Sequence, residues 1–186
     1  MTSAKVSRSI LQLILSEHQY MRHTYEQLKM IQDPAELEKS VRKWIEFICL
    51  HGHKEEIAFY PAVEKYLENG KHVVEHSLNE HRKLDKELKL LLEMVPEQEN
   101  SRDDNTYWKQ IRESMKPLLH HLDDEERKII IPLQSIINEQ EQERLAGEFD
   151  RAESVASAKP HPEMSKKAEE APMENIQIGL KEKQDL

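Results

Sequence analysis

Four stretches of this chain repeat apolar residues at alternating steps of three and four, which is the spacing of one buried face of an α-helix. They run over about residues 6–30, 34–69, 71–95 and 104–136. The links between them are mostly short, and the longest is a polar loop from Pro96 to Asn105. Four amphipathic helices of similar length joined in this way predict an all-α protein, an up-down-up-down four-helix bundle.

The predicted second helix has recognisable ends. Asp33 is a suitable N-cap, Pro34 suits the first helical position, and Glu36 completes a capping box. At the other end we expect Gly70 to terminate the helix by adopting the left-handed conformation, which glycine accepts without steric cost.

Three prolines fall inside the predicted helices. We expect Pro61 to kink the second helix or to end its regular part, because proline cannot donate a backbone hydrogen bond. Pro117 and Pro132 make the fourth helix the least regular of the four.

We place the bundle in residues 1–145 and a tail in residues 146–186. The tail is rich in Ala, Glu, Lys, Ser and Pro, so it buries too little apolar surface to offset its ordering entropy. We therefore expect a flexible acidic or polar segment that is disordered or loosely helical. Docking of Ile176, Ile178 and Leu180 is the alternative, and a protein partner, if there is one, is expected at this tail.

The composition excludes several classes of function. A formal net charge of −9 gives the chain no electrostatic reason to seek nucleic acid or an anionic membrane. We expect no transmembrane helix, because no apolar run of about 18 residues exists, and residues 9–15 are too short and interrupted for a secretory signal. A single cysteine, Cys49, cannot form an internal disulfide, which makes the cytosol the expected compartment.

Each predicted helix interrupts its apolar face with side chains able to bind metal. The helices contribute, in order, His18, then His51 and Glu55, then His81, then His121 and Glu125. In the second and fourth helices the histidine and the glutamate are four residues apart, so they share one face. The opposing directions of neighbouring helices then bring all six residues to one depth in the core.

A single histidine on an apolar face is usually a core residue bonded to a neighbour, but six polar residues in one layer need another explanation. Burying two carboxylates costs several kcal/mol per ion unless opposite charge compensates them. The predicted faces offer no Lys or Arg at this level, and neutral histidines do not supply the charge. A pair of divalent cations does, and a His and carboxylate shell suits iron, manganese or zinc.

The remaining histidines leave the predicted core faces. They are His23, His53, His72, His76, His120 and His161. His53 lies about 200° round the helix from His51, and His120 lies about 100° from His121. We expect surface positions for all of them, with His76 and His120 as candidates for orienting groups behind the ligands.

The motifs that hold these residues are "SEHQYM", "HGHKEEIAFYP", "NEHRKLDKEL" and "HHLDDEERKIIIP". One His-x-x-x-Glu is a weak signal, but two of them with single histidines on the other two helices are a strong one. Over about Ser9 to Asn138 the chain resembles the hemerythrin-like proteins, the HHE cation-binding domain.

The resemblance implies a centre of two iron ions. In it the bridging carboxylates correspond to Glu55 and Glu125, and the histidine pairs to His18 with His51 and His81 with His121. An oxo or hydroxo bridge would complete the cluster, and each iron would keep an open position for a small molecule.

The sequence departs from the oxygen-carrying hemerythrins in two places. Those carriers have a second histidine one turn before the ligand of the third helix, where this chain has Ser77. They also use His-x-x-x-x-Asp on the fourth helix, where this chain has His121-x-x-x-Glu125. The chain therefore resembles the six-ligand HHE branch, and His120 with Asp124 or Glu125 is the alternative pair on the fourth helix.

The resemblance implies a non-haem di-iron protein that binds a small ligand such as O₂, nitric oxide or peroxide, in sensing, storage or stress defence. One alternative is a di-iron enzyme that consumes peroxide or nitric oxide. The branch that repairs iron–sulphur centres carries an additional N-terminal cysteine-bearing domain, which we do not expect here because Cys49 falls within the second helix. Another alternative is a histidine-phosphotransfer bundle with His53 as the exposed phosphoacceptor.

Overall fold

The computed structural model describes residues 8–94 and 104–161, and all regular structure in these residues is helical. The four long helices are α1 (Ile10–Leu28), α2 (Pro34–Lys54), α4 (Gly70–Glu93) and α5 (Asp104–Glu125). α2 continues through a π-helical segment, η1 (Glu55–Phe59), into α3 (Tyr60–Tyr66). α5 likewise continues through η2 (Glu126–Ile130) into α6 (Ile131–Gln134), and α7 (Glu139–Ala152) follows.

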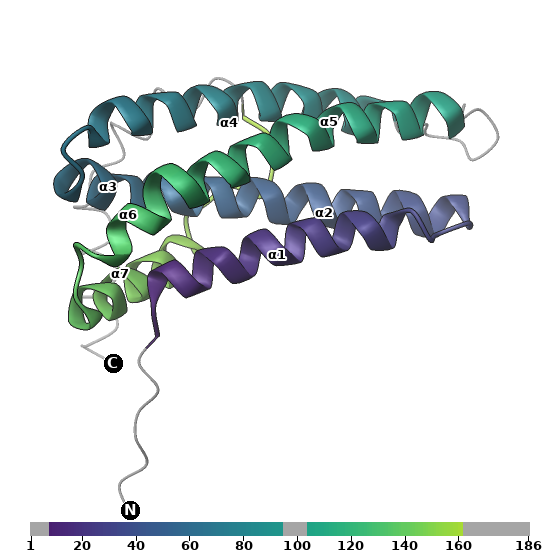
Figure 1. Ribbon diagram of the computed structural model, residues 1–186. Helices are drawn as coiled ribbons and strands as arrows, with labels where there is room; N and C mark the ends of the chain where they lie inside the picture. Colours follow the sequence, from purple (N-terminus) through teal and green to yellow (C-terminus); the bar gives the residue numbers. More distant parts are fainter. Residues whose placement is uncertain (1–7, 95–103, 162–186) are drawn as a thin grey trace, which may run out of the picture.

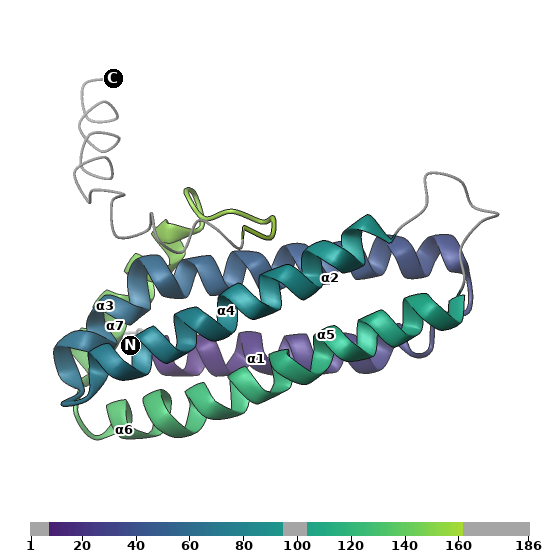
Figure 2. The ribbon, with the colours of Figure 1, turned by 90° about the horizontal axis from the view of Figure 1, so that it is seen from above.

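The long helices form the predicted up-down-up-down bundle. α1 packs on α2 and α4 packs on α5, while contacts of α2 with α4 and of α1 with α5 close the ring (Figure 1). α3, α6 and α7 gather at one end of the bundle (Figures 1 and 2). Among the helices of residues 8–94 and 104–161, none combines the length and the apolar character needed to cross a membrane.

The helix starts follow local capping chemistry. Asp33 caps α2 as predicted, with its side chain accepting from the Glu36 backbone N–H at 2.8 Å. The prediction for Gly70 is wrong, because this residue begins α4 and no described glycine has a positive φ. Glycine is needed there for space: a Cβ on Gly70 would lie 2.4 Å from the Val63 carbonyl oxygen.

Two of the three prolines, Pro61 and Pro132, each follow a π-helical segment, whereas Pro117 lies inside α5. The Tyr60 N–H bonds to the Glu55 carbonyl five residues back, and the Ile131 N–H bonds to the Glu126 carbonyl in the same way. Pro61 and Pro132 are then the second residues of the helices that follow, where a missing N–H costs little. The segment η1 starts four residues after His51, at Glu55, whereas η2 starts five residues after His121, at Glu126. This difference explains why the second proline lies one position later in its motif than the first.

The π segment also changes which apolar residues face inward near the end of the fourth helix. An unbroken α-helix predicts Ile136 on the buried face, but Ile136 is 48% exposed. Ile137, the next residue, is buried instead, and so is Leu133 one turn before it. An i→i+5 turn contains an extra residue, so it rotates every later side chain relative to the α-helical pattern.

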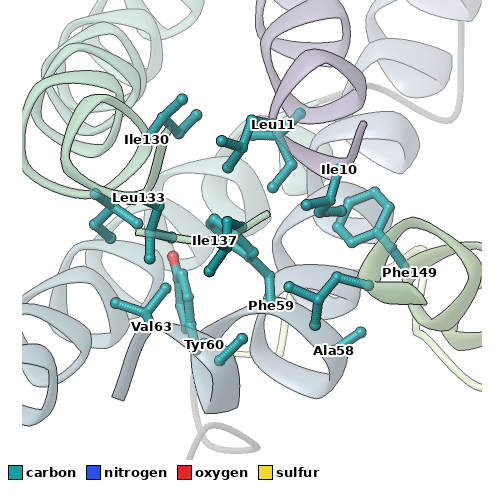
Figure 3. Packing of buried hydrophobic residues seen from close by; sticks show 14 of the residues in the cluster. Ile10, Leu11, Ala58, Phe59, Tyr60, Val63, Ile130, Leu133, Ile137 and Phe149 are labelled. Carbon is teal, nitrogen blue, oxygen red and sulfur yellow. The ribbon is translucent and has the colours of Figure 1, made fainter. Parts of the chain in front are cut away.

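The apolar core is divided into two clusters. One fills the end of the bundle that holds α3, α6 and α7, and includes Ile10, Phe59 and Leu133 (Figure 3). The other fills the opposite end, with Met21 and Trp44 among its members. The polar residues predicted for the centre lie between the two clusters along the helices.

The expected boundary at residue 145 falls inside α7. Leu145, Ala146, Phe149 and Ala152 of this helix are buried, so residues 146–152 are a packed part of the bundle and the expectation of a loose tail is wrong for them. α7 lies on α1 and η1, and Figure 3 shows Phe149 beside Ile10. The rest of the predicted tail, from residue 162 onward with Ile176, Ile178 and Leu180, lies outside the described residues, as does most of the 96–105 loop.

The segment that follows α7 returns over the bundle. The His53 ring of α2 donates from Nδ1 to the Ser157 carbonyl at 2.7 Å. The His161 backbone N–H donates to Asp85 Oδ2 of α4 at 2.9 Å. In Figure 2 this segment, coloured yellow-green, crosses the α2 and α4 side of the molecule.

Candidate metal centre

The structure brings together all six side chains that the sequence predicts for the centre. They come from the four long helices and from the first residue of η1, and each is at least 92% buried: His18, His51, Glu55, His81, His121 and Glu125. His121, and not His120 of the alternative pair, occupies this layer with Glu125, since His120 is on the exposed side of α5.

The six residues form two groups that share Glu55. Glu55 Oε1 lies 2.9 Å from His51 Nε2 and 3.8 Å from His18 Nε2. The other oxygen, Oε2, lies 3.7 Å from His81 Nε2, whose own neighbour is His121 Nε2 at 2.9 Å.

Glu125 lies across the layer from Glu55. Its Oε2 is 3.3 Å from His18 Nε2 and 3.9 Å from His121 Nε2, so it too reaches one histidine of each group. Each carboxylate therefore stands between two pairs of imidazole nitrogens. This is the arrangement that two metal ions with shared carboxylates require.

Several buried polar atoms of this layer have no hydrogen bond to any described residue. They are His18 Nε2, His51 Nε2 and all four carboxylate oxygens of Glu55 and Glu125. An unsatisfied buried carboxylate is costly, and here the unsatisfied atoms converge on one place. The donor set of imidazole nitrogens and carboxylate oxygens fits a pair of first-row transition-metal ions.

A ring of four outer glutamates holds the histidines from behind. Glu17 of α1 accepts from His51 of α2 at 2.7 Å, Glu56 of η1 from His81 of α4 at 2.8 Å, Glu80 of α4 from His121 of α5 at 3.2 Å, and Glu126 of η2 from His18 of α1 at 2.9 Å. Each glutamate thus orients the histidine of the next helix round the bundle. In all four pairs the bonded nitrogen is Nδ1, so Nε2 is the nitrogen that faces the centre.

The sequence reasoning missed these glutamates, although the chain carries a signal for them. Glu17 and Glu80 immediately precede the histidines of α1 and α4. Glu56 and Glu126 immediately follow the two central glutamates. The pattern of a glutamate next to a predicted ligand, as Glu-His twice and Glu-Glu twice, is the signal that could have predicted them.

Two cations hold outer glutamates in place. Lys54, which is buried, donates from Nζ to Glu17 Oε1 at 2.7 Å and lies 4.2 Å from the centre of the Phe149 ring. Arg22 donates to Glu126 Oε1 at 2.7 Å. A positive charge next to an outer carboxylate compensates its partial burial and keeps it ionised.

The carboxylates favour protonated histidines in the layer. Burial lowers the pKa of His81, but the hydrogen bond to Glu56 and the charges of Glu56 and Glu55 outweigh it and raise this pKa to about 9. Burial also opposes charge on His18, yet Glu125, Glu126 and Glu55 raise its pKa well above the ordinary value. Metal ions must displace these protons in order to bind.

Tyr60 is a second feature that the sequence reasoning missed. Its Oη is 3.1 Å from His81 Nε2, and burial, followed by the charges of Glu125 and Glu55, raises its pKa well above the ordinary value. Tyr60 faces the layer because it lies one π-helical turn after Glu55. An α-helical pattern turns it away, which is why periodicity did not find it.

A small cavity reaches the layer from the side of α2 and α4. It touches three of the central histidines, and apolar side chains such as Met21, Leu118 and Leu122 line much of the rest. Gly52 lies on its wall: a Cβ at this position would be 3.3 Å from His81 Cε1, so glycine allows close packing beside the centre. The cavity has room for a water-sized ligand.

The comparisons with known proteins agree with this arrangement. The model of the hemerythrin HHE cation-binding domain family matches residues 9–131. An uncharacterised hemerythrin-like protein of Schizosaccharomyces pombe is 28% identical over 161 residues, which cover 86% of this chain and 76% of that protein. No solved structure gives a significant match.

Proposed function

Because this chain belongs to the hemerythrin HHE cation-binding domain family, we propose that its central layer holds two iron ions and binds a small ligand beside them. In this proposal one ion is held by His18 and His51, and the other by His81 and His121, with Glu55 and Glu125 between them. The ligand is a molecule of the size of O₂, nitric oxide or peroxide. Sensing, storage and stress defence are the roles that such binding serves.

The observation that carries the proposal is the convergence of unsatisfied atoms. Imidazole nitrogens and four carboxylate oxygens face one another in a layer shielded from solvent by two apolar clusters. Without positive charge at their midpoint, Glu55 and Glu125 would be costly to bury. Iron supplies that charge and the redox chemistry, and the chain fixes the geometry.

The chain's own residues prepare the layer for a small ligand. The outer glutamates hold every Nε2 in position, which limits the reorganisation needed on metal binding. The cavity beside His81 and His121 is lined in part by apolar side chains, which suits a weakly polar diatomic molecule. Cys49 is buried and free, so it is compatible with the reducing cytosol that the proposal assumes.

Metal content and optical spectra of the protein purified without added metal test the proposal. We expect two iron ions per chain and near-ultraviolet absorption that changes on addition of reductant, azide or nitric oxide. His18→Ala should lose both, whereas His23→Ala, an exposed histidine on the same helix, should keep both. Manganese or zinc in place of iron would contradict the choice of metal, and a chain free of metal would overturn the proposal.

A second candidate, turnover of peroxide or nitric oxide, is favoured by Tyr60. Its hydroxyl keeps its proton at neutral pH and lies beside His81, where it can donate a hydrogen bond to a bound ligand. Steady-state consumption by the iron-loaded protein, compared with Tyr60→Phe, tests this candidate. Binding without turnover in the unaltered protein would leave ligand binding as the function.

Phosphotransfer at His53 is not favoured. That histidine is half-buried, and its Nδ1 is occupied by the Ser157 carbonyl. A phosphoacceptor needs a ring that a partner protein can reach.

A further inference from the structure

A second group of metal-binding side chains lies on the outer face of α4 and α5. His76 and Glu80 are four residues apart on α4, and His120 and Asp124 are four residues apart on α5. Residues at this spacing share a helix face, and α4 and α5 run side by side in opposite directions (Figure 2). The two pairs therefore meet across the seam between the helices.

Three ligand atoms of this group, one from each of His76, Glu80 and Asp124, lie within 4.8 Å of one another. His76 Nε2 is 3.5 Å from Glu80 Oε1 and 3.6 Å from Asp124 Oδ2. A tetrahedral ion with metal–ligand distances of about 2.1 Å separates its ligand atoms by about 3.4 Å. The observed separations are long for hydrogen bonds but match two edges of such a tetrahedron.

The two carboxylates of the group are well held. Glu80 is only 13% exposed, and His120 Nδ1 donates to its Oε1 at 3.0 Å. Asp124 is 8% exposed, and Arg127 and Lys128 both donate to it. His76, by contrast, is 46% exposed, which gives an ion a path from solvent.

We propose that His76, Glu80 and Asp124 form a second, exchangeable site for a divalent transition-metal ion, with water in the fourth position. One nitrogen and two carboxylate oxygens suit Zn²⁺, Fe²⁺ or Mn²⁺. The carboxylates of Glu80 and Asp124 supply negative charge, and Arg127 stays paired with the other oxygen of Asp124. His120 steadies Glu80 from the other side. Lys128 competes with the ion for Asp124 Oδ2 and moves aside when the ion binds, since its side chain is 43% exposed.

The outer site touches the central layer through Glu80. Its Oε1 faces the outer site, while its Oε2 accepts from His121 Nδ1. The carboxylate of Glu80 would therefore connect an ion on the outer face to His121, the central histidine of α5. This position suits a site that collects ions at the surface of the bundle, near the place where the central layer would receive them.

Calorimetric titration with Zn²⁺ tests the inference on the full chain after incubation with iron to fill the central layer. We expect the unaltered protein to bind one Zn²⁺ that His76→Ala binds at least about tenfold more weakly, because a ligand is lost. Asp124→Asn should weaken the same event. Lys128→Gln should strengthen it, because the competing amine is removed.

The matched control is His72→Ala, an exposed histidine one turn earlier on α4. Equal Zn²⁺ binding by the unaltered protein and His76→Ala would overturn the inference, as would an equal loss in His72→Ala. Iron is measured after each titration, so that Zn²⁺ that merely replaces central iron is recognised as evidence against the outer site. The test compares the Zn²⁺ affinity of the variants with that of the unaltered protein. This comparison is valid whether or not the central layer takes iron.

Discussion

At the scale of single residues, the ring of outer glutamates explains how four flexible side chains can share one orientation. Each histidine is fixed at Nδ1 by a carboxylate of the neighbouring helix. Rotation of any ring would break a charge-assisted hydrogen bond, which is stronger than a neutral one. Closure of the ring round the bundle also links the positions of all four helices.

Glu56→Gln tests the ring at one position. Glutamine keeps a hydrogen-bond acceptor near His81 but removes the charge that makes the imidazole a better ligand. We expect metal affinity to fall by about 10–100-fold, as for other groups behind metal ligands. Glu46→Gln, at an exposed position of α2, serves as the control in metal competition assays and should leave affinity unchanged. A folded Glu56→Gln protein with full affinity would contradict an orienting role.

The raised pKa of His81 predicts how the metal-free protein responds to alkaline pH. Its pKa rises from 6.5 in the unfolded chain to about 9 in the folded one, so the folded state holds this proton more tightly. The resulting stabilisation is fully present below pH 6.5 and is lost as the pH rises toward 9. His18 and His51, whose pKa values are also raised, act in the same direction.

Urea unfolding of the metal-free protein across this pH range checks the prediction. The free energy of unfolding should fall between pH 6.5 and 9, and His81→Gln should show a shallower fall. A steady or rising free energy over this range would contradict the assignment of a bound proton to His81.

Two glycines allow a matched test of packing beside the centre. Alanine at Gly52 would place its Cβ 3.3 Å from His81, a ring already fixed by Glu56, so we expect weaker metal binding although alanine favours helix. Alanine at Gly147 meets only the mobile end of Arg151 at 3.4 Å and should stabilise α7 by up to about 1 kcal/mol. Thermal unfolding and metal affinity, measured on both variants, separate the two effects. Unchanged affinity in Gly52→Ala would show that the His81 ring can move.

At the scale of elements, periodicity predicted the four long helices and the six central residues. The helices are confirmed, and the six residues share one layer because His51 with Glu55 and His121 with Glu125 lie on regular or nearly regular α-helix, where a step of four residues keeps one face. Metal binding by these residues stays a prediction. Periodicity failed where the helix changes from α-helical to π-helical turns. The π segments place Tyr60 in the layer and exchange Ile136 for Ile137, and no composition signal marks them apart from the prolines that follow.

α7 was missed for a different reason. Its buried side chains are spaced for a helix, but glutamate, alanine and glutamine dominate the segment and few large apolar residues stand out. Phe149 alone supplies much of the contact, through Ile10, Lys54 and the edge of the His51 ring. Tertiary contact of this kind with distant residues is not encoded in local composition.

Phe149→Ala measures how firmly α7 belongs to the bundle. Removal of a fully buried aromatic side chain should lower the free energy of unfolding by about 3–5 kcal/mol. Val155→Ala, at an exposed position just after the helix, should change it little. Chemical unfolding followed by circular dichroism gives both values, and a small loss in Phe149→Ala would restore the loose tail that the composition suggested.

At the scale of the whole molecule, we expect the polar layer to be the part of the fold that gains most stability from metal. The two apolar clusters each hold one end of the bundle, but between them lie two carboxylates without hydrogen-bond partners among the described residues. A ligand that binds only the folded state stabilises it by mass action, by about 2.7 kcal/mol when its free concentration is about 100 times Kd. We therefore expect metal to act on the middle of all four long helices at once.

Removal of metal with a chelator should lower the melting temperature and should speed amide hydrogen exchange most around His18, His51, His81 and His121. Amides near Trp44 and Phe59, inside the two apolar clusters, should change less, because burial there does not depend on the ion. Restoring iron should reverse both changes, and His51→Ala should show neither response. If the chelator changes neither the melting temperature nor the exchange rates, the expectation is wrong. The outer glutamates and the bound protons would then be sufficient to stabilise the buried layer.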